Sequence, residues 1–344
     1  MNIRKMNIIE TQDYLQFADL FKRSGLELNL DDSGKGPEGF ITAWKAVDEA
    51  GALVGGCAIT RKKDYYVLND IAVEEELRST GIGRLLFQTA MTRMLDMGAR
   101  QVHITAKAPK FFEKYGFRYL EPEDTPDIFG CKNCDQYGKT CKPEFMVFEY
   151  SGERLLFIDS CVTTHISRTM RLADHYLEQF IKAHPGVNVE TVIVEKGCAE
   201  PLDRDDINRR NDLATAGAYD DPMFDYAHQF KRADYVLVGA PYWDCAFPAI
   251  LKVYIENIVV TGLTFEESET GYSGLCRCKE LTYITTAGGP IGDKNLGFDY
   301  ICGIGDMLGV KSFKEYRAEC LDVVGMDHEA IMEQALAVID AGEI

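Results

Sequence analysis

The fold follows most directly from the run YVLVGAPYWDC at residues 235–245, which continues as FPAILK at residues 247–252. An apolar, β-branched run that stops at Ala-Pro predicts a buried parallel strand, and a proline in the first turn of the next segment predicts a helix. Ligands of open α/β sheets bind outside the carboxyl ends of the strands, so residues 241–245 are expected to line a crevice. Tyr242 and Trp243 would offer flat faces to a planar heterocycle; the alternative is a strand end with two core aromatic residues.

The composition favours a two-domain chain with reduced cysteines. At 344 residues the chain exceeds the usual size of one core, and it has neither a run of 18 apolar residues nor an apolar signal sequence. Eleven cysteines, an odd number, favour thiols or metal ligands over disulfides. The formal net charge is −18, and 17 basic against 32 acidic residues give −15 for residues 151–344. We therefore expect a cytoplasmic protein that binds neither nucleic acid nor membranes.

Two other predicted strand ends in the second half carry residues suited to ligand binding. The strand expected at residues 154–158 leads into a helix that begins near Met170, which places Ser160, Ser167 and Thr169 on a loop at a helix N-terminus. Hydroxyl and N–H groups there suit a terminal phosphate, and a helix cap by Ser167 is the alternative. The strand expected at residues 280–285 ends in TAGGP, whose glycines allow close approach of the backbone to a ligand. No Gly-x-Gly-x-x-Gly run is present, so the dinucleotide fingerprint is excluded.

Together these segments resemble the FMN-dependent NADH:quinone reductase and azoreductase family over residues 154–341. The matching segments are Ser160-x6-Ser167-x-Thr169, APYWD at 240–244, Pro248-x-x-Leu251-Lys252-x-Tyr254-Ile255-x-x-Ile258, Gly262-x-Thr264-Phe265 and Thr286-x-Gly288-Gly289. The resemblance implies a flavodoxin-like doubly wound sheet, hydride transfer from NAD(P)H through flavin N5 to a small electron-poor acceptor such as a quinone or azo compound, and a homodimer. The FMN-binding residues that it implies are Ser160, Ser167, Arg168, Thr169, Pro241, Tyr242, Trp243, Asp244, Cys245, Thr286, Ala287, Gly288 and Gly289.

The sequence departs from this family at three positions beside the expected flavin ring. Asp244 and Cys245 stand where an Asn and an apolar aromatic residue are common, and Ala287 stands where a basic residue often lies. An acid near the ring disfavours an anionic reduced flavin, so the resemblance alone does not set the reduction potential or the substrate.

The first half has the pattern of a mixed α/β domain with a phosphate-binding turn. A helix is expected over residues 11–25, a hairpin over residues 39–60 and a third strand over residues 65–73. That strand runs into EEELRSTGIGRLL at residues 74–86, and a helix follows to Met97. Gly81 and Gly83 place backbone N–H groups in a turn at the N-terminus of this helix, a geometry suited to a pyrophosphate.

With a further strand at residues 101–106 and the run FFEKYGF at residues 111–117, this junction resembles the GNAT family of acyl-CoA-dependent N-acetyltransferases over residues 1–150. The resemblance implies acetyl transfer from acetyl-CoA to a small amine or a protein. Many members carry a tyrosine where this chain has Phe112, and that tyrosine protonates the leaving thiolate. Tyr115 lies about 300° further around a helix, so the acid and the base are unassigned. The implied acetyl-CoA-binding residues are Val73, Arg78, Ser79, Thr80, Gly81, Ile82, Gly83 and Arg84.

Three cysteines form a compact cluster in the sequence before the last strand of the first half. Cys131, Cys134 and Cys141 have the spacing Cys-x2-Cys-x6-Cys, which lets three thiolates converge on one ion. A tetrahedral metal needs a fourth ligand, for which Cys57, Asp135, water or a partner are candidates. We expect a structural zinc or an iron–sulfur cluster here, and the alternative is a loop with three free thiols.

These patterns predict an α/β fusion protein. Residues 1–150 are expected to form a GNAT-like acetyltransferase domain, and residues 151–344 a flavodoxin-like, FMN-binding NAD(P)H oxidoreductase domain. Two other interpretations are that acetylation is the main activity with the flavin domain as a redox sensor, or that the GNAT-like domain is a non-catalytic metal- or partner-binding module.

Overall fold

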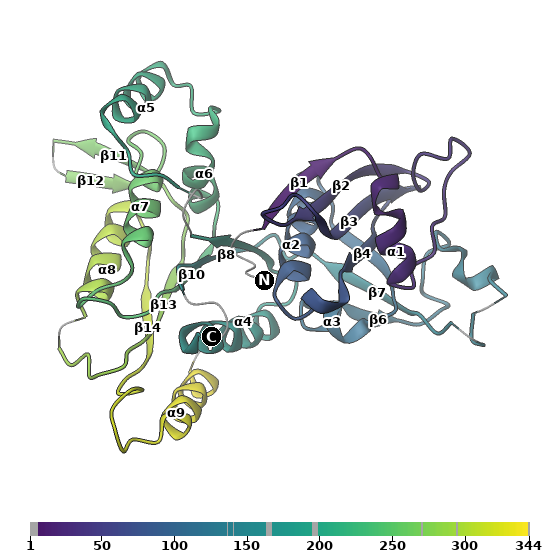
Figure 1. Ribbon diagram of the computed structural model, residues 1–344. Helices are drawn as coiled ribbons and strands as arrows, with labels where there is room; N and C mark the ends of the chain where they lie inside the picture. The colour runs from purple at the N-terminus through teal and green to yellow at the C-terminus, as the bar shows by residue number, and fades with distance from the viewer. Residues whose placement is uncertain are drawn as a thin grey trace. The chain divides into compact units, whose positions relative to one another are not determined.

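The computed structural model describes residues 6–135, 137–139, 141–162, 167–194, 199–269, 271–293 and 295–342 (Figure 1). Its contacts divide the chain into two compact units. The first comprises Met1–Gly152 and Ile181–Asn188, and the second Glu153–Phe180 and Val189–Ile344. Within the described ranges, no helix is both long enough and apolar enough to cross a membrane.

The first unit is built on a seven-stranded sheet with the order β1-β2-β3-β4-β5-β7-β6. Both faces of this sheet are covered by apolar side chains. One face packs against α2 (Ile82–Asp96) through Leu86 and Met94, and the other packs against α1 (Ala18–Arg23) through Phe21. The strands are β1 (Asn7–Thr11), β2 (Phe40–Val47), β3 (Leu53–Lys62), β4 (Tyr65–Val73), β5 (Gln101–Ala106), β6 (Arg118–Leu120) and β7 (Glu144–Glu149).

Strand β4 pairs irregularly with both of its neighbours. Along β3, the partner of Ala58 is Asp70 and the partner of Ile59 is Leu68, so Asn69 is an extra residue in β4, as in a β-bulge. On the other side, β4 pairs with β5 in parallel only at Tyr66↔Val102 and Val67↔His103. Both strands continue beyond these pairs, so the sheet opens between them towards the carboxyl end of β4. From that end, η3 (Glu75–Leu77) leads to the N-terminus of α2.

The second unit contains a five-stranded sheet with the order β14-β13-β10-β8-β9. The pairs β8–β10, β10–β13 and β13–β14 are parallel. In chain order within this unit, the arrangement is 2-1-3-4-5, the strand order of flavodoxin-like folds. The strands are β8 (Arg154–Asp159), β9 (Asn188–Ile193), β10 (Tyr235–Gly239), β13 (Glu280–Thr286) and β14 (Phe313–Ala318).

Helices cover both faces of this sheet. Figure 1 shows α4 (Arg168–Ala183) and α9 (His328–Ala341) on one face, and α6 (Asp225–Lys231), α7 (Ala249–Ile258) and α8 (Leu296–Leu308) on the other. Alternate side chains of β8 and β10 point into the core beneath α6, α7 and α8. The unit also contains α5 (Arg204–Ala216) and the hairpin of β11 (Phe265–Ser268) and β12 (Gly271–Gly274).

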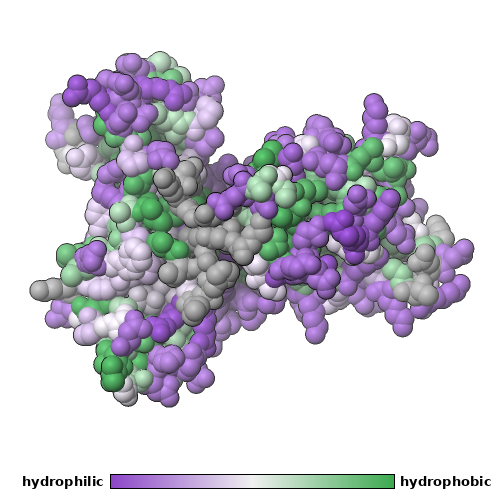
Figure 2. Space-filling model, viewed as in Figure 1, coloured by the Kyte–Doolittle hydropathy of each residue, from purple (hydrophilic) through white to green (hydrophobic). Residues whose placement is uncertain are grey.

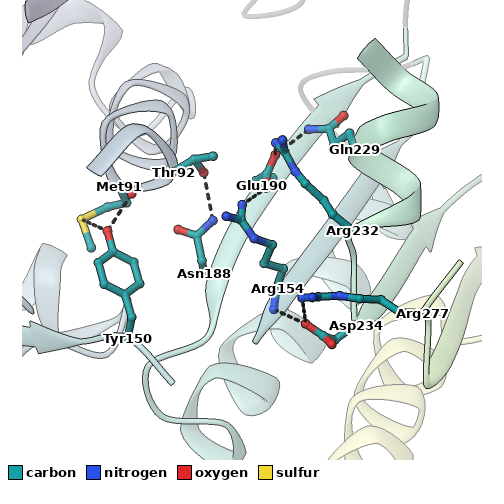
Figure 3. Close-up of polar contacts among 10 residues, drawn as sticks. All are labelled: Met91, Thr92, Tyr150, Arg154, Asn188, Glu190, Gln229, Arg232, Asp234 and Arg277. Carbon is teal, nitrogen blue, oxygen red and sulfur yellow. Dashed lines mark hydrogen bonds and ion pairs between the residues drawn. The ribbon is translucent and has the colours of Figure 1, made fainter. Parts of the chain in front are cut away.

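A buried carboxylate links elements around the amino end of β8 (Figure 3). Glu190, on β9, is 8% exposed and accepts hydrogen bonds from Arg154 at 3.1 Å, Arg232 at 2.7 Å and Gln229 at 2.9 Å. A second carboxylate, Asp234, accepts a bond of 2.9 Å from the backbone N–H of Arg154. These contacts tie β8, β9, α6 and the loop before β10 together.

The predicted fold class is confirmed in both halves. The second half has the doubly wound parallel sheet, with the buried run at residues 235–239 as one of its strands. The GNAT-like half has the expected mixed sheet. The helix expected over residues 11–25 is wrong at its start. Residues 7–11 form β1, which pairs with β2 as an edge strand, and Thr11 accepts a side-chain hydrogen bond from the N–H of Asp13 at 3.1 Å in the turn that follows. Only Thr11 of the expected helix is in β1, and helical structure begins after this turn, with η2 (Leu15–Phe17) and then α1.

Candidate functional site

The carboxyl ends of β8, β10 and β13 meet at one edge of the second unit. The N–H of Ser160 donates to the carbonyl of Gly239 at 2.9 Å, and the N–H of Tyr242 donates to the carbonyl of Thr286 at 3.0 Å. The three loops that the sequence analysis singled out are thus brought together by backbone hydrogen bonds between neighbouring strand ends.

The aromatic loop after β10 contains a tight, strained turn. Trp243 and Ala246 exchange backbone hydrogen bonds of 3.1 and 2.7 Å, and the two residues between them, Asp244 and Cys245, have φ of 50° and 67°. Consecutive left-handed residues define a type I′ turn, which glycine and asparagine adopt more readily than cysteine. The turn leaves Trp243 46% exposed, so its ring is available at this edge.

The predicted phosphate-binding residues divide into two groups. Ser160 and Thr169 are buried, and their hydroxyls are used within the protein: Ser160 donates to the carbonyl of Gly239 at 3.0 Å, and Thr169 shares a hydrogen bond of 2.6 Å with Thr286. Ser167 and Arg168 are only partly buried at the start of α4, and the Ser167 hydroxyl accepts a bond from the N–H of Met170 at 3.2 Å. Residues 163–166 of the predicted loop lie outside the described residues.

The Gly-rich loop after β13 has a partner that the sequence analysis missed. The N–H of Asp322, in the loop after β14, donates to the carbonyl of Gly288 at 2.8 Å, and its carboxylate binds Arg168 at 2.7 Å. A Cβ on Gly288 would lie 2.4 Å from Oδ2 of Asp322, whereas a Cβ on Gly289 would meet no atom within 4 Å. Asp322 therefore connects the Gly-rich loop to the start of α4. No local pattern marks it, because it follows a strand for which no ligand role was predicted.

The predicted acetyl-CoA residues in the first unit lie around the N-terminus of α2. Gly81 is the N-cap of this helix with φ of 100°, and Ser79 is also left-handed with φ of 64°. No side chain makes a cap hydrogen bond at Gly81, and the first turn holds no acidic residue. Backbone N–H groups and the positive end of the helix dipole are therefore directed to an uncapped terminus that suits an anion.

Two further predicted features lie near this terminus. Val73 ends β4 on the opened side of the sheet, and Nε of Arg78 donates to its carbonyl at 3.4 Å. Phe112, in α3 (Pro109–Glu113), is 7% exposed and packs edge-on against Phe117. Tyr115 packs against Phe87 with ring centroids 4.8 Å apart. Phe112 is thus a core residue here.

The two halves of the chain match different families of known proteins. Residues 153–341 match the family model described as flavodoxin-like fold, which covers more than half of the chain. The chain belongs to this flavodoxin-like family. Residues 40–119 of the same flavodoxin-like protein match a second model, described as acetyltransferase (GNAT) domain.

Named relatives of this flavodoxin-like protein match its second half. It is 35% identical over 175 residues to the FMN-dependent NADH:quinone oxidoreductase of Caldicellulosiruptor saccharolyticus, covering 49% of this chain and 87% of the relative. It is also 35% identical over 176 residues to the FMN-dependent NADH:quinone oxidoreductase 2 of Clostridium acetobutylicum, covering 50% and 88%. A solved azoreductase from Bacillus anthracis is 21% identical with a TM-score of 0.49, covering 55% of this chain and 100% of that chain.

The three-cysteine loop of this flavodoxin-like protein does not support the expected metal. Among the residues that the structure describes, no group of three or more His, Cys, Asp and Glu side chains is placed to hold an ion. Cys131, Cys134 and Cys141 are partly buried free thiols. Cys131 packs against the apolar cluster of Val67, Phe129 and Phe145, and burial raises the pKa of its thiol. Cys131 thus packs partly into the apolar core, and Cys134 and Cys141 lie near enough to raise its pKa further.

Proposed function

We propose that the chain is a bifunctional enzyme, with an FMN-dependent NAD(P)H oxidoreductase in its second half and an acetyl-CoA-dependent N-acetyltransferase in its first half. The observation that carries the first activity is the meeting of three loops at the carboxyl ends of β8, β10 and β13, where the strand order reverses. The names of the relatives support the cofactor, the donor and a quinone as the electron acceptor. Azo compounds are a second acceptor class of the same electron-poor type.

The residues at this edge fit FMN with a different division of roles from the one that the resemblance implied. The hydroxyls of Ser160 and Thr169 are buried and already bonded, so these residues shape the loop. The phosphate would be held by the N-terminal N–H groups of α4 together with Ser167 and Arg168. Asp322 positions the Arg168 guanidinium, which has five N–H donors in total.

The ring would lie between the aromatic loop and the Gly-rich loop. Gly289 leaves open space where any other residue would place a side chain. Trp243 is exposed on the loop after β10, the strand next to β13 in the sheet. Desolvation and a hydrogen bond with Cys245 raise the pKa of Tyr242. Its hydroxyl is a donor at neutral pH, as in an ordinary tyrosine with a pKa of about 10. FMN, when bound, accepts a hydride from a nicotinamide and passes two electrons to the acceptor. The protein's part is to orient both substrates and limit water.

The oxidoreductase proposal is tested on the full chain. We expect one FMN per chain by mass spectrometry and loss of the oxidised-flavin absorbance when NADH or NADPH is added without oxygen. Trp243→Ala should weaken FMN binding by about 0.5–1.5 kcal/mol, because an aromatic face is lost. Tyr272→Ala is the matched control, since Tyr272 is an aromatic residue of the same unit, 65% exposed on β12. Recovery of FAD, or of no flavin after reconstitution, would refute the proposal.

We also propose that the oxidoreductase half forms a homodimer. Exposed apolar side chains lie on the loops after β8, β10 and β14 and at the start of α8, and Figure 2 shows hydrophobic residues over the loop between β14 and α9 against the hydrophilic surface of α5. Sedimentation should give twice the chain mass of 38.6 kDa. Val324→Asp should shift this to the monomer, and Val338→Asp, an exposed position on α9, should not. The side chains in question are Val162, Trp243, Leu296, Val323, Val324 and Met326.

The acetyltransferase half is supported by the uncapped N-terminus of α2 beside the opening between β4 and β5. We expect acetyl-CoA to bind the full chain and a primary amine to release the free CoA thiol. Binding without thiol release would favour a GNAT-like sensor or partner module. Thiol release from a chain whose flavin cannot be reduced by NADH or NADPH would favour acetylation as the main activity.

A further inference from the structure

A buried carboxyl group lies where the sheet of the first unit opens. Asp70 is 6% exposed, follows the bulge residue Asn69 on β4, and lies on the face that packs against α1. The Tyr14 hydroxyl donates to Oδ2 of Asp70 at 2.8 Å, and the Asn69 side chain donates to the same oxygen at 2.6 Å. Among the described residues no hydrogen bond is made to Oδ1, so this oxygen is the one able to take a proton.

The backbone around Asp70 is open on the side of β5. The last residue pair between β4 and β5 is Val67↔His103, three residues before Asp70. Backbone polar groups of a buried strand need partners, and a ligand inserted between the two strands would supply them. Bulges commonly re-aim a side chain next to an active site. Asp70 therefore lies one strand position beyond the bulge, at the opening that leads to the N-terminus of α2.

The surroundings of Asp70 hold the pKa of its carboxyl above that of an ordinary Asp. Its charged or titratable partners in the described part of the chain are Tyr14, before α1, and Lys62 and Cys57, both on β3. Burial raises the pKa of Asp70, and the hydrogen bonds from Asn69 and Tyr14 and the charge of Lys62 oppose that rise. A base whose pKa lies closer to neutral is a better match to proton removal from an ammonium group than an ordinary surface Asp.

We propose that Asp70 is the proton acceptor of acetyl transfer, and that the acetyl acceptor is a primary amine that reaches the opening between β4 and β5 from the α1 face. This inference rests on the proposed acetyltransferase function. Oδ1 of Asp70 takes a proton from the amine nitrogen, whose lone pair attacks the thioester carbon of acetyl-CoA. The new N–C bond forms as the C–S bond breaks. The electron pair of the C–S bond leaves on the CoA sulfur, as the thiolate. The excess proton that remains on the nitrogen passes through solvent to the thiolate, and solvent takes the other proton from Asp70.

Charge at the opening agrees with an amine as the acceptor. A protonated amine pairs with a carboxylate, and Asp70 is the carboxylate at the opening. Lys62, whose charge acts on Asp70, lies towards the amino end of β4, where it pairs with Tyr65. An acceptor that is itself anionic would be repelled by the Asp70 carboxylate.

The first test compares Asp70→Asn with two other variants of the full chain. A panel of primary amines containing a polyamine, an aminoglycoside and a lysine peptide is assayed for CoA thiol release. Asp70→Asn should lower kcat/KM by at least about 100-fold while acetyl-CoA affinity, measured by calorimetry, stays unchanged. Asp70→Glu should restore part of the rate. Asp64→Asn, an exposed acid of the same hairpin, should behave as the native chain.

The second test separates proton transfer from a structural role. Tyr14→Phe removes a hydrogen bond that lowers the pKa of Asp70, so the acid limb of the kcat/KM profile should move to higher pH. A structural role would lower the rate at every pH without moving the limb, and that result overturns the proposal. An Asp70→Asn rate within a few-fold of native does the same. Acetyl-CoA binding without transfer to any amine would instead overturn the acetyltransferase proposal, and this inference with it.

Discussion

Gly81 shows at the scale of one residue how the acetyl-CoA turn depends on backbone geometry. Its φ of 100° is in the left-handed region, where a Cβ raises the conformational energy of a residue by about 1–2 kcal/mol. We expect Gly81→Glu to abolish acetyl-CoA binding, because the substitution adds this strain and places a carboxylate at the helix terminus proposed for the pyrophosphate. Calorimetric titration of the full chain with acetyl-CoA measures the effect.

Two controls separate the causes of this loss. Gly81→Ala adds the strain without the charge and should retain weakened binding. Gly130→Ala, at a glycine of the same unit outside this turn, should change the affinity by less than about 0.5 kcal/mol, since its Cβ would meet no atom within 4 Å. NADH oxidation should be unaffected by all three variants. Native affinity in Gly81→Glu would contradict the assigned turn.

Asp70 gives a second prediction at this scale, for stability rather than catalysis. Burial raises the pKa of its carboxyl in the folded chain. Such a group favours folding at pH values below its unfolded pKa of about 3.9, and this contribution is lost as the pH rises through the folded pKa. Asp70→Asn should therefore be more stable than the native chain at neutral pH, and the difference should shrink as the pH falls.

Urea unfolding at a series of pH values measures this difference. Asp64→Asn, whose side chain is 97% exposed, is the control and should stay within about 0.5 kcal/mol of native throughout. A stability difference for Asp70→Asn that does not vary with pH would show that the charge of the buried carboxyl carries no cost. A gain in stability with a loss of transfer would mark Asp70 as a residue kept for function.

At the scale of an element, the turn at residues 243–246 holds backbone strain beside the proposed flavin site. Asp-Gly is a preferred pair for a type I′ turn, and this chain has Asp244-Cys245 instead. Cys245→Gly should raise the free energy of unfolding by about 0.5–1 kcal/mol, because relief of a left-handed Cβ exceeds the added entropy of glycine. Unfolding in urea, followed by flavin fluorescence, reports on this unit.

The neighbouring residue provides the control for the turn. Ala246 lacks a left-handed φ, so Ala246→Gly should lower the stability by about 0.5–1 kcal/mol. If both glycine variants lose stability equally, the turn at Asp244-Cys245 stores no strain.

The Glu190 cluster makes a prediction about how the second unit is held together. Glu190→Ala leaves Arg154, whose side chain is 14% exposed, and Arg232 without their shared carboxylate (Figure 3). Removal of one partner from a buried ion pair costs about 3–5 kcal/mol, so we expect a loss of this size in urea unfolding. Glu329→Ala breaks a pair with Arg171 whose side chains are 60% and 44% exposed, and it should cost about 0–1 kcal/mol. If the two variants lose the same free energy of unfolding, burial does not make the Glu190 pairs more important for stability than an exposed pair.

For the whole molecule, the sequence predicted what depends on local pattern and missed what depends on pairing. The buried run at residues 235–239 and the glycine at position 81 have the conformations expected of them. The position of Asp70 could not be read, because the bulge at Asn69 arises only when β4 pairs with β3. Asp322 was missed for a similar reason: it reaches Gly288 across 34 residues, through the parallel pairing of β13 with β14. The packing of Cys131 against Val67, Phe129 and Phe145 could not be read either, because it is a tertiary property.

The strand order of the second unit also limits how early this unit can fold while the chain is being synthesised. Leu155 on β8 pairs with Tyr235 on β10, 80 residues later (235 − 155). At a synthesis rate of about 5–20 residues per second, β8 waits roughly 4–16 s for its neighbour in the centre of the sheet. Strands β2, β3 and β4 pair in succession as they emerge. Nascent chains should therefore show a protease-resistant first unit well before the second.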